Sequence, residues 1–361
     1  MSMVDASCRP PAWEWRDDMP LDNTLRLPTR SVRALILHCL DAQTLAAAEV
    51  ATWLADPATR VLGGGSNVVF VQPTVKRTVH VTAADWWVEQ QPPEQVDLVA
   101  EAGLGLDQLV RETAARGWFG LEALAEIPGT VGAAPVQNVG AYGVELAQRV
   151  RWVEAWDRVE SRLHHLERDN CQFRYRQSRF KSEPGRWLIL RVGLRLATRP
   201  PEDWPPISYP GLKEAVADWQ AVSARPVAQM SPLEYAELIT RLRLTKLPDW
   251  RADLPGSAGS FFHNPIVSTA TARALRERWL GMPQFLAEDG VKIPAGWLIE
   301  HIGLRGYREG PVGVSDRHAL VLQHYGGASG ESFLRFAEDV RERVLATYGI
   351  RLTIEPECVG S

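Results

Sequence analysis

The stretch at residues 120–143, GLEALAEIPGTVGAAPVQNVGAYG, constrains the fold of this chain more than any other. It is dense in glycine, alanine, proline, glutamine and asparagine, carries few charges and has no clear periodicity. It is therefore too apolar for a solvated linker and too rich in breakers for a regular helix or strand. A buried irregular segment must satisfy its backbone polar groups, and a bound polar cofactor is one way to do so. The alternative is an ordinary buried loop; the composition favours the cofactor.

A second irregular segment, Gly63-Gly64-Gly65-Ser66-Asn67, follows a predicted strand. Consecutive glycines allow positive φ and let backbone N–H groups approach an anion closely, while serine and asparagine add short donors. These residues alone leave a phosphate cradle and a ligand-free strand connection equally open. Gly103-Leu104-Gly105 has Gln108 where a dinucleotide fingerprint needs its third glycine, and no G-x-x-x-x-G-K-[ST] occurs. A nucleotide would therefore bind through other motifs.

Composition and charge are those of an ordinary globular protein. Hydrophobic residues make up 45% and charged residues 23% of the 361 positions, and this length suggests about two or three domains. The formal charge of −4 and the lack of a long Lys/Arg run give a nucleic-acid partner little support. The longest apolar stretch, 34–55, is interrupted by polar and charged residues, and the N-terminus has no apolar signal region. We therefore expect a cytoplasmic protein without a membrane partner.

Cysteine and histidine spacing predicts no metal site. The cysteines are widely scattered without a C-x-x-C pair, which favours reduced thiols over a disulfide framework or a zinc site: Cys8, Cys39, Cys171 and Cys358. The eight histidines show no metal-binding spacing, and His164-His165 fits an exposed strand better than a ligand pair.

Hydrophobic periodicity predicts an α+β fold, because helices and strands are mixed without regular alternation. Strands are predicted at 33–40, 59–62, 79–81, 97–102, 187–197 and 350–354. Helices are predicted at 42–55 and 106–114, after a capping box at Ser231–Glu234, and over 333–348 with Gly349 at the end.

Three further segments could carry chemistry. FRYRQSRFK at 173–181 is either a solvated basic strand edge or a set of guanidinium groups that bind a carboxylate or pyrophosphate. Ser260, in GSAGSFFHN, lacks a G-x-S-x-G elbow, so a hydrolase nucleophile is disfavoured. The paired carboxylates of Glu355-Pro356-Glu357 lie near the chain end, where such groups are usually solvated.

Together and in this order, the motifs resemble those of the UDP-N-acetylenolpyruvoylglucosamine reductase family. They are GGGSNVVF, IPGTVGAAPVQNVGAYGVE, FRYRQSRFK, RLTKLPD, GSAGSFFHNP, AGWLIE and EPE, and they run from Leu62 to Glu357. FRYRQSRFK together with Ser208-Tyr209-Pro210-Gly211 resembles the longer, Tyr-loop form of that family. The resemblance implies an FAD-binding domain of the vanillyl-alcohol-oxidase (PCMH) type in two subdomains, 1–80 and 81–243. It further implies a smaller α/β substrate-binding domain at 244–349 and a C-terminal strand and tail at 350–361.

The resemblance also implies a reaction. NADPH reduces bound FAD, and the reduced flavin then passes hydride to the vinyl carbon of UDP-N-acetylglucosamine enolpyruvate, giving UDP-N-acetylmuramate for peptidoglycan synthesis. Hydride addition pushes negative charge onto the substrate carboxylate, so cations or acidic donors must already be in position. Arg176 matches the family arginine for this role, with Glu357 assisting, and Ser260 matches the serine that donates a proton to the adjacent carbon.

Binding residues follow from the same resemblance. The expected cofactor-binding residues are Gly63, Gly64, Gly65, Ser66, Asn67, Ile127, Pro128, Gly129, Gly132, Ala133, Gln137, Asn138, Gly140, Tyr142 and Gly143. The expected substrate-binding residues are Tyr175, Tyr209, Arg243, Lys246, Asn264 and His318. We expect FAD and NADPH as cofactors, the enolpyruvyl sugar nucleotide as substrate, and a monomer.

One departure from the family pattern affects the site. His263 stands where related sequences often carry lysine, which predicts a weaker or pH-dependent phosphate contact. Glu357 is chosen over Glu355 from its position within EPE. Two other functions are disfavoured because Arg176, Ser260 and Glu357 occur together: an O₂-dependent alcohol or sugar oxidase on the same fold, and a flavin- or UDP-sugar-binding protein without turnover.

Overall fold

The computed structural model describes residues 11–207 and 211–360. The chain forms two compact units, and it passes between them several times. The first unit comprises Met1–Met19, Ser31–Gly64 and Lys76–Arg243, and the second comprises Pro20–Arg30, Gly65–Val75 and Leu244–Ser361. The predicted boundaries at 80, 243 and 349 stay predictions.

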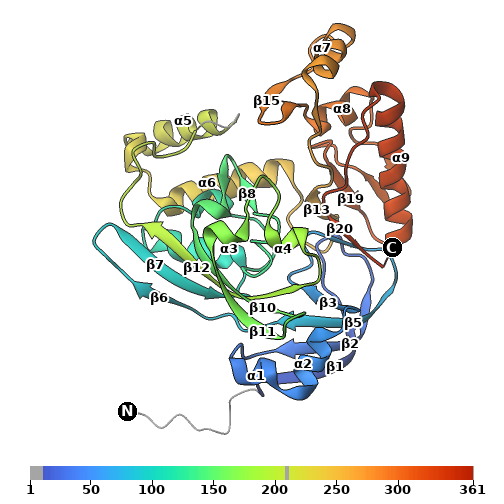
Figure 1. The fold of residues 1–361 in the computed structure, drawn as a ribbon. Helices are drawn as coiled ribbons and strands as arrows, with labels where there is room; N and C mark the ends of the chain where they lie inside the picture. The colour runs from blue at the N-terminus through green and yellow to red at the C-terminus, as the bar shows by residue number, and fades with distance from the viewer. Residues whose placement is uncertain (1–10, 208–210, 361) are drawn as a thin grey trace. The chain divides into compact units, whose positions relative to one another are not determined.

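The larger sheet of the first unit has five antiparallel strands (Figure 1). Their order is β11 (Arg162–Glu167), β10 (Val150–Asp157), β12 (Trp187–Ala197), β7 (Gln95–Glu101) and β6 (Trp86–Gln90). The strand predicted at 187–197 is confirmed with the same bounds. Its leucines and its valine are buried, but the expectation that they share one face is wrong. Leu188 and Leu190 belong to one apolar cluster, whereas Val192, Leu194 and Leu196 belong to another together with Trp187 and Ile189. A register shift between Ile189 and Arg191 separates the two groups.

The second sheet of the first unit has the order β1 (Trp13–Pro20), β2 (Arg30–Leu37), β5 (Thr74–Val81) and β3 (Thr59–Leu62). The helix predicted at 42–55 is two helices, α1 (Ala42–Ala46) and α2 (Ala48–Ala55), because Ala47 adopts ψ 130°. Trp15 meets the ring of Trp53 edge-on at 4.8 Å, and the Arg77 guanidinium lies 3.7 Å from the Trp53 ring centre. These contacts give the N-terminal tryptophan a packing role.

Helices α3 (Leu106–Ala115), α4 (Arg179–Ser182), α5 (Leu212–Ser223) and α6 (Pro232–Lys246) complete this part of the chain. The capping box predicted for α6 is confirmed, since Ser231 Oγ accepts from Glu234 N at 3.2 Å and Glu234 Oε2 accepts from Ser231 N at 2.9 Å. Apolar residues of α3 and α6 join the five-stranded sheet in one core.

In the second unit, the described residues form small sheets and helices, besides the last turn of α6. The first sheet has the order β13 (Gly256–Ser260), β19 (Val321–His324), β18 (Val312–Val314) and β17 (Arg308–Glu309). The second has the order β14 (Ile266–Val267), β16 (Gly290–Lys292) and β15 (Phe285–Ala287). The third is the parallel pair of β20 (Glu357–Val359) and β4 (Val68–Phe70). The helices are α7 (Thr269–Arg278), α8 (Ala295–His301) and α9 (Gly330–Tyr348), and Gly349 ends α9 in the left-handed conformation, as predicted. One apolar core joins these elements.

The strand predicted at 350–354 is wrong. This segment makes a single bridge, between Ile354 and Phe262, and the last strand begins at Glu357. The apolar alternation of Ile350 and Leu352 comes from packing into the core beside α9 rather than from a ladder. Pro356 has no N–H to donate, so regular pairing starts only after it, alongside β4.

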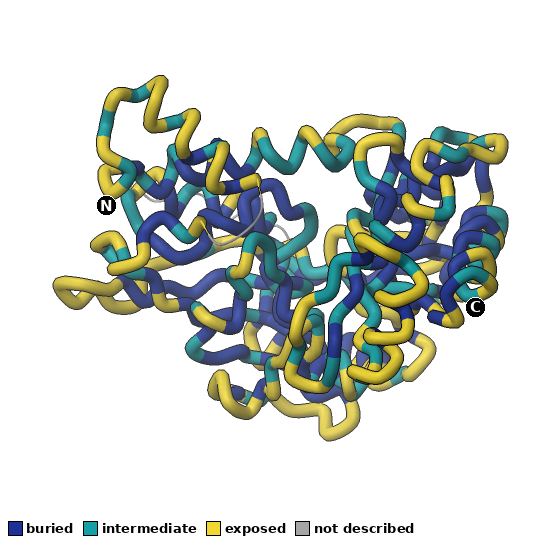
Figure 2. The backbone as a smooth tube through the Cα atoms, turned by 90° about the horizontal axis from the view of Figure 1, so that it is seen from above, coloured by how far each residue is buried: buried dark blue, intermediate teal, exposed yellow. Residues whose placement is uncertain are grey.

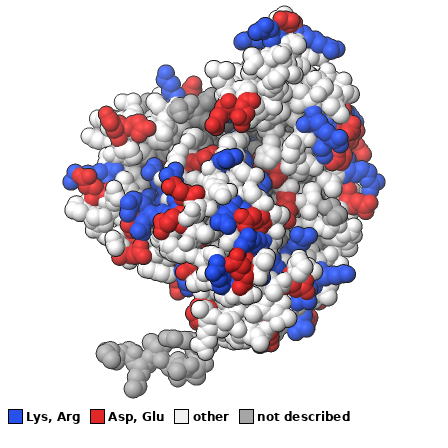
Figure 3. Space-filling view, in the orientation of Figure 1, with Lys and Arg blue, Asp and Glu red and all other residues white. Residues whose placement is uncertain are grey.

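Helices and strands are mixed in both units, so the α+β class is confirmed. Buried residues run along the strands and the inner faces of the helices, whereas exposed residues gather in turns (Figure 2). On the face drawn in Figure 3, acidic and basic side chains are interspersed. Among the residues that the structure describes, no helix is long and apolar enough to cross a bilayer.

One buried ion pair in the five-stranded sheet predicts a pH-dependent loss of stability. Asp97 is 1% exposed and accepts two hydrogen bonds of 2.7 Å from Arg195. These bonds hold the pKa of Asp97 below its usual range, so the pair stabilises the fold above about pH 4 and loses that effect as pH falls through the lowered pKa. Asp97→Asn should cost about 1–3 kcal/mol at pH 7, less than a fully buried pair because Arg195 is half-exposed.

Urea unfolding of the unsubstituted protein and of Asp97→Asn, each at pH 7 and at pH 3.5, checks this. The difference between their unfolding midpoints should be smaller at the lower pH. Glu94→Gln, which removes an exposed pair with Arg199, is the matched control and should shift the midpoint little. A gap that stays constant with pH would contradict the assignment.

Candidate active site

The two glycine-rich segments predicted to bind a cofactor meet in the first unit. A Cβ on Gly63 would lie 2.9 Å from both Ala133 Cβ and Thr130 Oγ1, and a Cβ on Gly64 would lie 3.0 Å from Gly129 Cα. At Gly64 the neighbouring atoms belong to the Gly129 backbone, whereas at Gly63 they belong to side chains, and both positions leave little room for a side chain. This crowding explains why glycine occupies these two positions.

The segment around Gly129 is held from the other side by the loop before α3. Leu106 N donates to Gly129 O at 3.0 Å, Val131 N to Leu104 O at 2.8 Å, and Gly132 N to Ala102 O at 2.9 Å. A Cβ on Gly132 would lie 2.5 Å from Ala102 Cβ. The irregular backbone is thus supported by a second loop, and Gly103-Leu104-Gly105 acts as its scaffold rather than as a dinucleotide fingerprint.

The end of the same segment forms a tight hairpin, β8 (Gly140–Ala141) and β9 (Val144–Glu145). Tyr142 and Gly143 connect the strands with φ of 53° and 85°, which is the pattern of a type I′ turn. Arg176 Nη2 donates to Gly140 O at 2.9 Å. The structure therefore brings the predicted arginine to the predicted cofactor segment.

A buried ionic network below this segment was missed by the sequence reasoning. Arg111 donates to Asp107 Oδ2 at 2.8 Å, to Glu126 Oε2 at 3.2 Å and to Thr240 Oγ1 at 3.1 Å. Asp107 Oδ1 accepts from Glu126 N at 2.6 Å, and Glu126 takes a positive φ of 64° directly before Ile127. An acidic residue at i of α3 with arginine at i+4 was the only sequence signal.

Arg243 lies near these carboxylates. Burial lowers the pKa of Arg243, and the negative charges of Glu126 and Asp107 oppose that effect, as does Tyr142 when ionised. Its Nε is buried and has no hydrogen-bond partner among the described residues. A buried guanidinium N–H without an acceptor fits a site that takes an oxygen-rich ligand.

In the second unit, Ser260 ends β13 and is exposed, next to Gly259 at φ 70°. Glu355 N donates to Phe261 O at 2.9 Å, and Glu355 Oε2 lies 3.5 Å from His263 Nδ1. Glu357 is exposed at the start of β20, where its N–H donates to Asn67 O at 3.0 Å. The two candidate carboxylates thus differ: Glu355 adjoins an imidazole, whereas Glu357 adjoins the Gly65–Asn67 segment.

Lys246 and His318 come together in the same unit. Burial lowers the pKa of His318, and the cation of Lys246 lowers it further. His318 Nδ1 accepts from Leu320 N at 3.2 Å, so the neutral ring carries its proton on Nε2 and can donate from there. Asn264 Oδ1 accepts from Ala295 N at 2.9 Å at the start of α8, which leaves its NH₂ group to donate to a ligand.

The remaining predicted residues are placed as follows. Gly65 has φ 62°, and a Cβ there would lie 2.2 Å from Asp22 O; Ser66 O accepts from Thr24 Oγ1 at 3.4 Å. Ile127 is buried, and Pro128 and Gln137 are half-buried. Tyr175 is exposed, and the Arg176 guanidinium lies 5.4 Å from the centre of the Tyr175 ring. Tyr209 lies outside the described residues.

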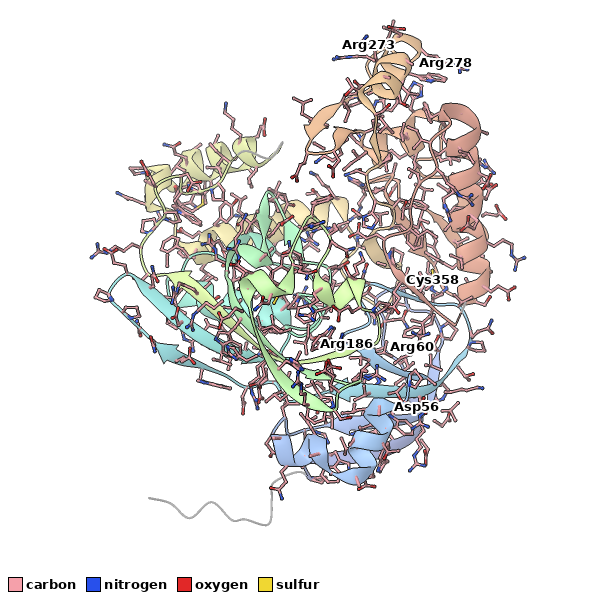
Figure 4. The ribbon with its side chains drawn as sticks, viewed as in Figure 1. Asp56, Arg60, Arg186, Arg273, Arg278 and Cys358 are labelled. Carbon is pink, nitrogen blue, oxygen red and sulfur yellow. The ribbon has the colours of Figure 1, made fainter. Side chains whose placement is uncertain are left out.

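A further acidic cluster has its ligand atoms taken. Asp157, Glu160 and His164 lie within metal-binding range of one another. Asp157 Oδ2 accepts from Arg186 at 2.6 Å, Arg186 also binds Glu160, and Arg162 Nε lies 2.9 Å from His164 Nε2. Arg186, labelled in Figure 4, occupies the position that a cation would need.

Cys39, Cys171 and Cys358 are free thiols.

Both glycine-rich segments lie in a part of the chain that matches a known family of cofactor-binding domains. The family model "FAD binding domain" matches residues 38–166, and "UDP-N-acetylenolpyruvoylglucosamine reductase, C-terminal domain" matches residues 250–359. The fold and the site thus define an FAD-dependent oxidoreductase. The reductase of that name from Azoarcus sp. (strain BH72) is 40% identical over 92% of this chain and 94% of its own length. The chain belongs to the UDP-N-acetylenolpyruvoylglucosamine reductase family.

Other relatives support the same assignment. The reductase from Pseudomonas aeruginosa is 39% identical over 82% of this chain and 84% of its own length. The crystal structure of the reductase from Thermus caldophilus has a TM-score of 0.63 and 22% identity, covering 96% of this chain and 98% of that one. That likeness concerns the fold. FAD and NADPH are accordingly the cofactors of this chain.

Proposed function

We propose that this protein reduces UDP-N-acetylglucosamine enolpyruvate to UDP-N-acetylmuramate with NADPH, and that Arg176, Ser260 and Glu357 carry the step at the substrate. Membership of the reductase family supports the reaction. The observation that carries the residue assignment is the contact between Arg176 and the hairpin of the glycine-rich segment. When bound, FAD supplies the hydride that NADPH delivers to it.

Arg176 is suited to stabilise the substrate carboxylate. Its turn is closed by two hydrogen bonds of 3.0 Å between Arg174 and Gln177, and Lys181 Nζ donates to Arg176 O at 3.1 Å. A guanidinium group on a braced turn is preorganised for the negative charge that develops when hydride reaches the neighbouring carbon. Glu357, proposed to assist, follows Pro356 at the fixed start of β20.

Ser260 is proposed to protonate the carbon next to the carboxylate. A free serine is a weak acid, so its alkoxide must be stabilised locally or reprotonated quickly through water or neighbours. Its exposure allows water to reach the hydroxyl. Its place after Gly259, in an irregular part of β13, frees the side chain from regular strand packing.

The sugar nucleotide needs cations and donors for its diphosphate. In the second unit, Lys246 supplies a cation. The Nε2–H of neutral His318 and the NH₂ group of Asn264 supply hydrogen-bond donors there. Arg243, whose buried Nε has no partner within residues 11–207 and 211–360, supplies a guanidinium in the first. Tyr175 and Tyr209 are proposed substrate contacts by family resemblance, as is the Tyr-loop form itself.

We propose that the backbone of Gly63 and Gly64 and of the 127–143 segment binds the cofactor in the first unit. Gly65, Ser66 and Asn67 are proposed in the second. The close approach of the Gly64 and Gly129 backbones supports this proposal, because donors without side chains can surround a pyrophosphate. We also propose a cytoplasmic monomer.

Product analysis tests the reaction. With the enolpyruvyl sugar nucleotide present, the protein should consume NADPH over many turnovers, whereas without it consumption should stop at one equivalent per bound flavin under anaerobic conditions. Mass spectrometry should show a product heavier than the substrate by one hydride and one proton. Oxygen consumption and peroxide formation with an alcohol substrate would support the alternative oxidase instead.

A further inference from the structure

The turn that carries Arg176 is tied to the cofactor segment at three points within the first unit. Ser178 Oγ donates to Val136 O at 2.5 Å, Asn138 Nδ2 donates to Arg174 O at 3.1 Å, and Arg176 Nη2 donates to Gly140 O at 2.9 Å. The two outer ties fix the backbone on either side of the turn. The third fixes the arginine side chain itself.

Asn138 lies at the centre of these ties. It is 0% exposed and takes a positive φ of 45°. Besides Arg174 O, its Nδ2 donates to Glu145 Oε2 at 2.7 Å, and its Oδ1 accepts from Ala147 N at 3.0 Å. Both amide hydrogens and the amide oxygen are therefore bonded to protein. The side chain joins the segment before β8, the strand β9 and the Arg174 turn.

We infer that Asn138 is a positioning residue for Arg176, acting through the carbonyl of Arg174 rather than by touching a ligand with its side chain. The inference rests on the proposed role of Arg176. Arg176 adopts φ 54°, a conformation that an arginine rarely takes and that needs support from its surroundings. Asn138 supplies that support at the first residue of the turn, and Glu145 in turn orients the Asn138 amide.

Asn138→Asp tests this with little change of shape. Aspartate keeps the acceptor for Ala147 N and tolerates a positive φ as asparagine does. It replaces the Nδ2 donor with an oxygen that faces the Glu145 carboxylate and the Arg174 carbonyl, so both contacts become repulsive. The Arg174 carbonyl should be released and the Arg176 turn displaced.

The readout separates two half-reactions, reduction of the bound flavin by NADPH and its reoxidation by the enolpyruvyl substrate. Asn138→Asp should slow reoxidation by about 10–100-fold, the loss expected for a small displacement of a catalytic group. The fold-loss in the rate of reoxidation should exceed the fold-loss in the rate of flavin reduction by about tenfold or more. The double variant with Arg176→Ala should be no slower than Arg176→Ala alone, because a group that acts only through Arg176 has nothing left to position.

Controls distinguish positioning from general loss of stability. Ser31→Ala removes an equally buried hydrogen bond, 2.8 Å to Thr78, in the other sheet of the unit, and should lower the melting temperature without changing the ratio of the two rates. Asn138→Gly removes the amide but retains the backbone freedom, and should reproduce the selective defect if the aspartate variant does not fold.

The outcomes are distinct. Additive losses in the double variant, or equal slowing of both half-reactions, would overturn the positioning role of Asn138. Normal reoxidation in Arg176→Ala would instead overturn the proposed role of Arg176.

Discussion

Replacement of Ser260 by alanine should leave a protein that NADPH still bleaches but that the enolpyruvyl substrate no longer recolours. The loss should be confined to reoxidation, because the proposed donor acts only when the substrate carbon takes its proton. A positioned general acid contributes about 10²–10⁴-fold, so reoxidation should slow by that factor. Stopped-flow absorbance at the flavin band, with each half-reaction started separately, measures it.

Ser257→Ala is the matched control, because Ser257 lies on the same strand and its backbone N–H bonds Thr24 O. That variant should retain both rates. Ser260→Cys should restore part of the reoxidation rate if proton donation is the role, since a thiol is the stronger acid. Normal turnover by Ser260→Ala would remove Ser260 from the mechanism.

Arg176→Ala should also fail in reoxidation, by about 10²–10³-fold, the usual effect of losing one preorganised group that stabilises developing negative charge. Stopped-flow measurement of the same two half-reactions applies. The reoxidation rate of Arg176→Lys should lie between those of the unsubstituted protein and Arg176→Ala. Lysine keeps the positive charge but cannot form the bidentate hydrogen bonds of a guanidinium group.

Arg174→Ala serves as the control for this variant, since Arg174 is an exposed arginine in the same turn and its contact with Asn138 is through the backbone carbonyl. Reoxidation should be close to normal there. Equal effects of Arg174→Ala and Arg176→Ala would mean that total positive charge in the turn matters, and not the position of one guanidinium group.

The elements that were predicted correctly follow from physical reasons that hold locally. The strand at 187–197 follows from alternation, α6 from its capping box and the end of α9 from Gly349. The strand expected at 350–354 failed because alternation reports burial, and burial can arise from packing beside a helix as well as from a sheet. Whether a strand forms depends on a partner, which local sequence does not specify.

The site was predictable as a set of segments, but not as a set of contacts. Glycine enrichment identified 63–65 and 127–143, yet only the structure reveals that Gly64 is packed on Gly129. Asn138 stood among the expected cofactor residues, whereas its amide is bonded to Glu145, Arg174 and Ala147. The Asp107, Arg111 and Glu126 network escaped notice because an i, i+4 pair on a helix is common, and nothing in the sequence shows that Glu126, 15 residues after Arg111, joins it.

The most direct test of the central proposal is an anaerobic absorbance titration of the purified protein at the flavin band. NADPH is added first, and the enolpyruvyl UDP-sugar second. We predict that NADPH bleaches the yellow colour and that the substrate restores it in stoichiometric amount. Bleaching without recovery would mean that another acceptor takes the electrons, and a colourless protein that takes up no added FAD would contradict the account as a whole.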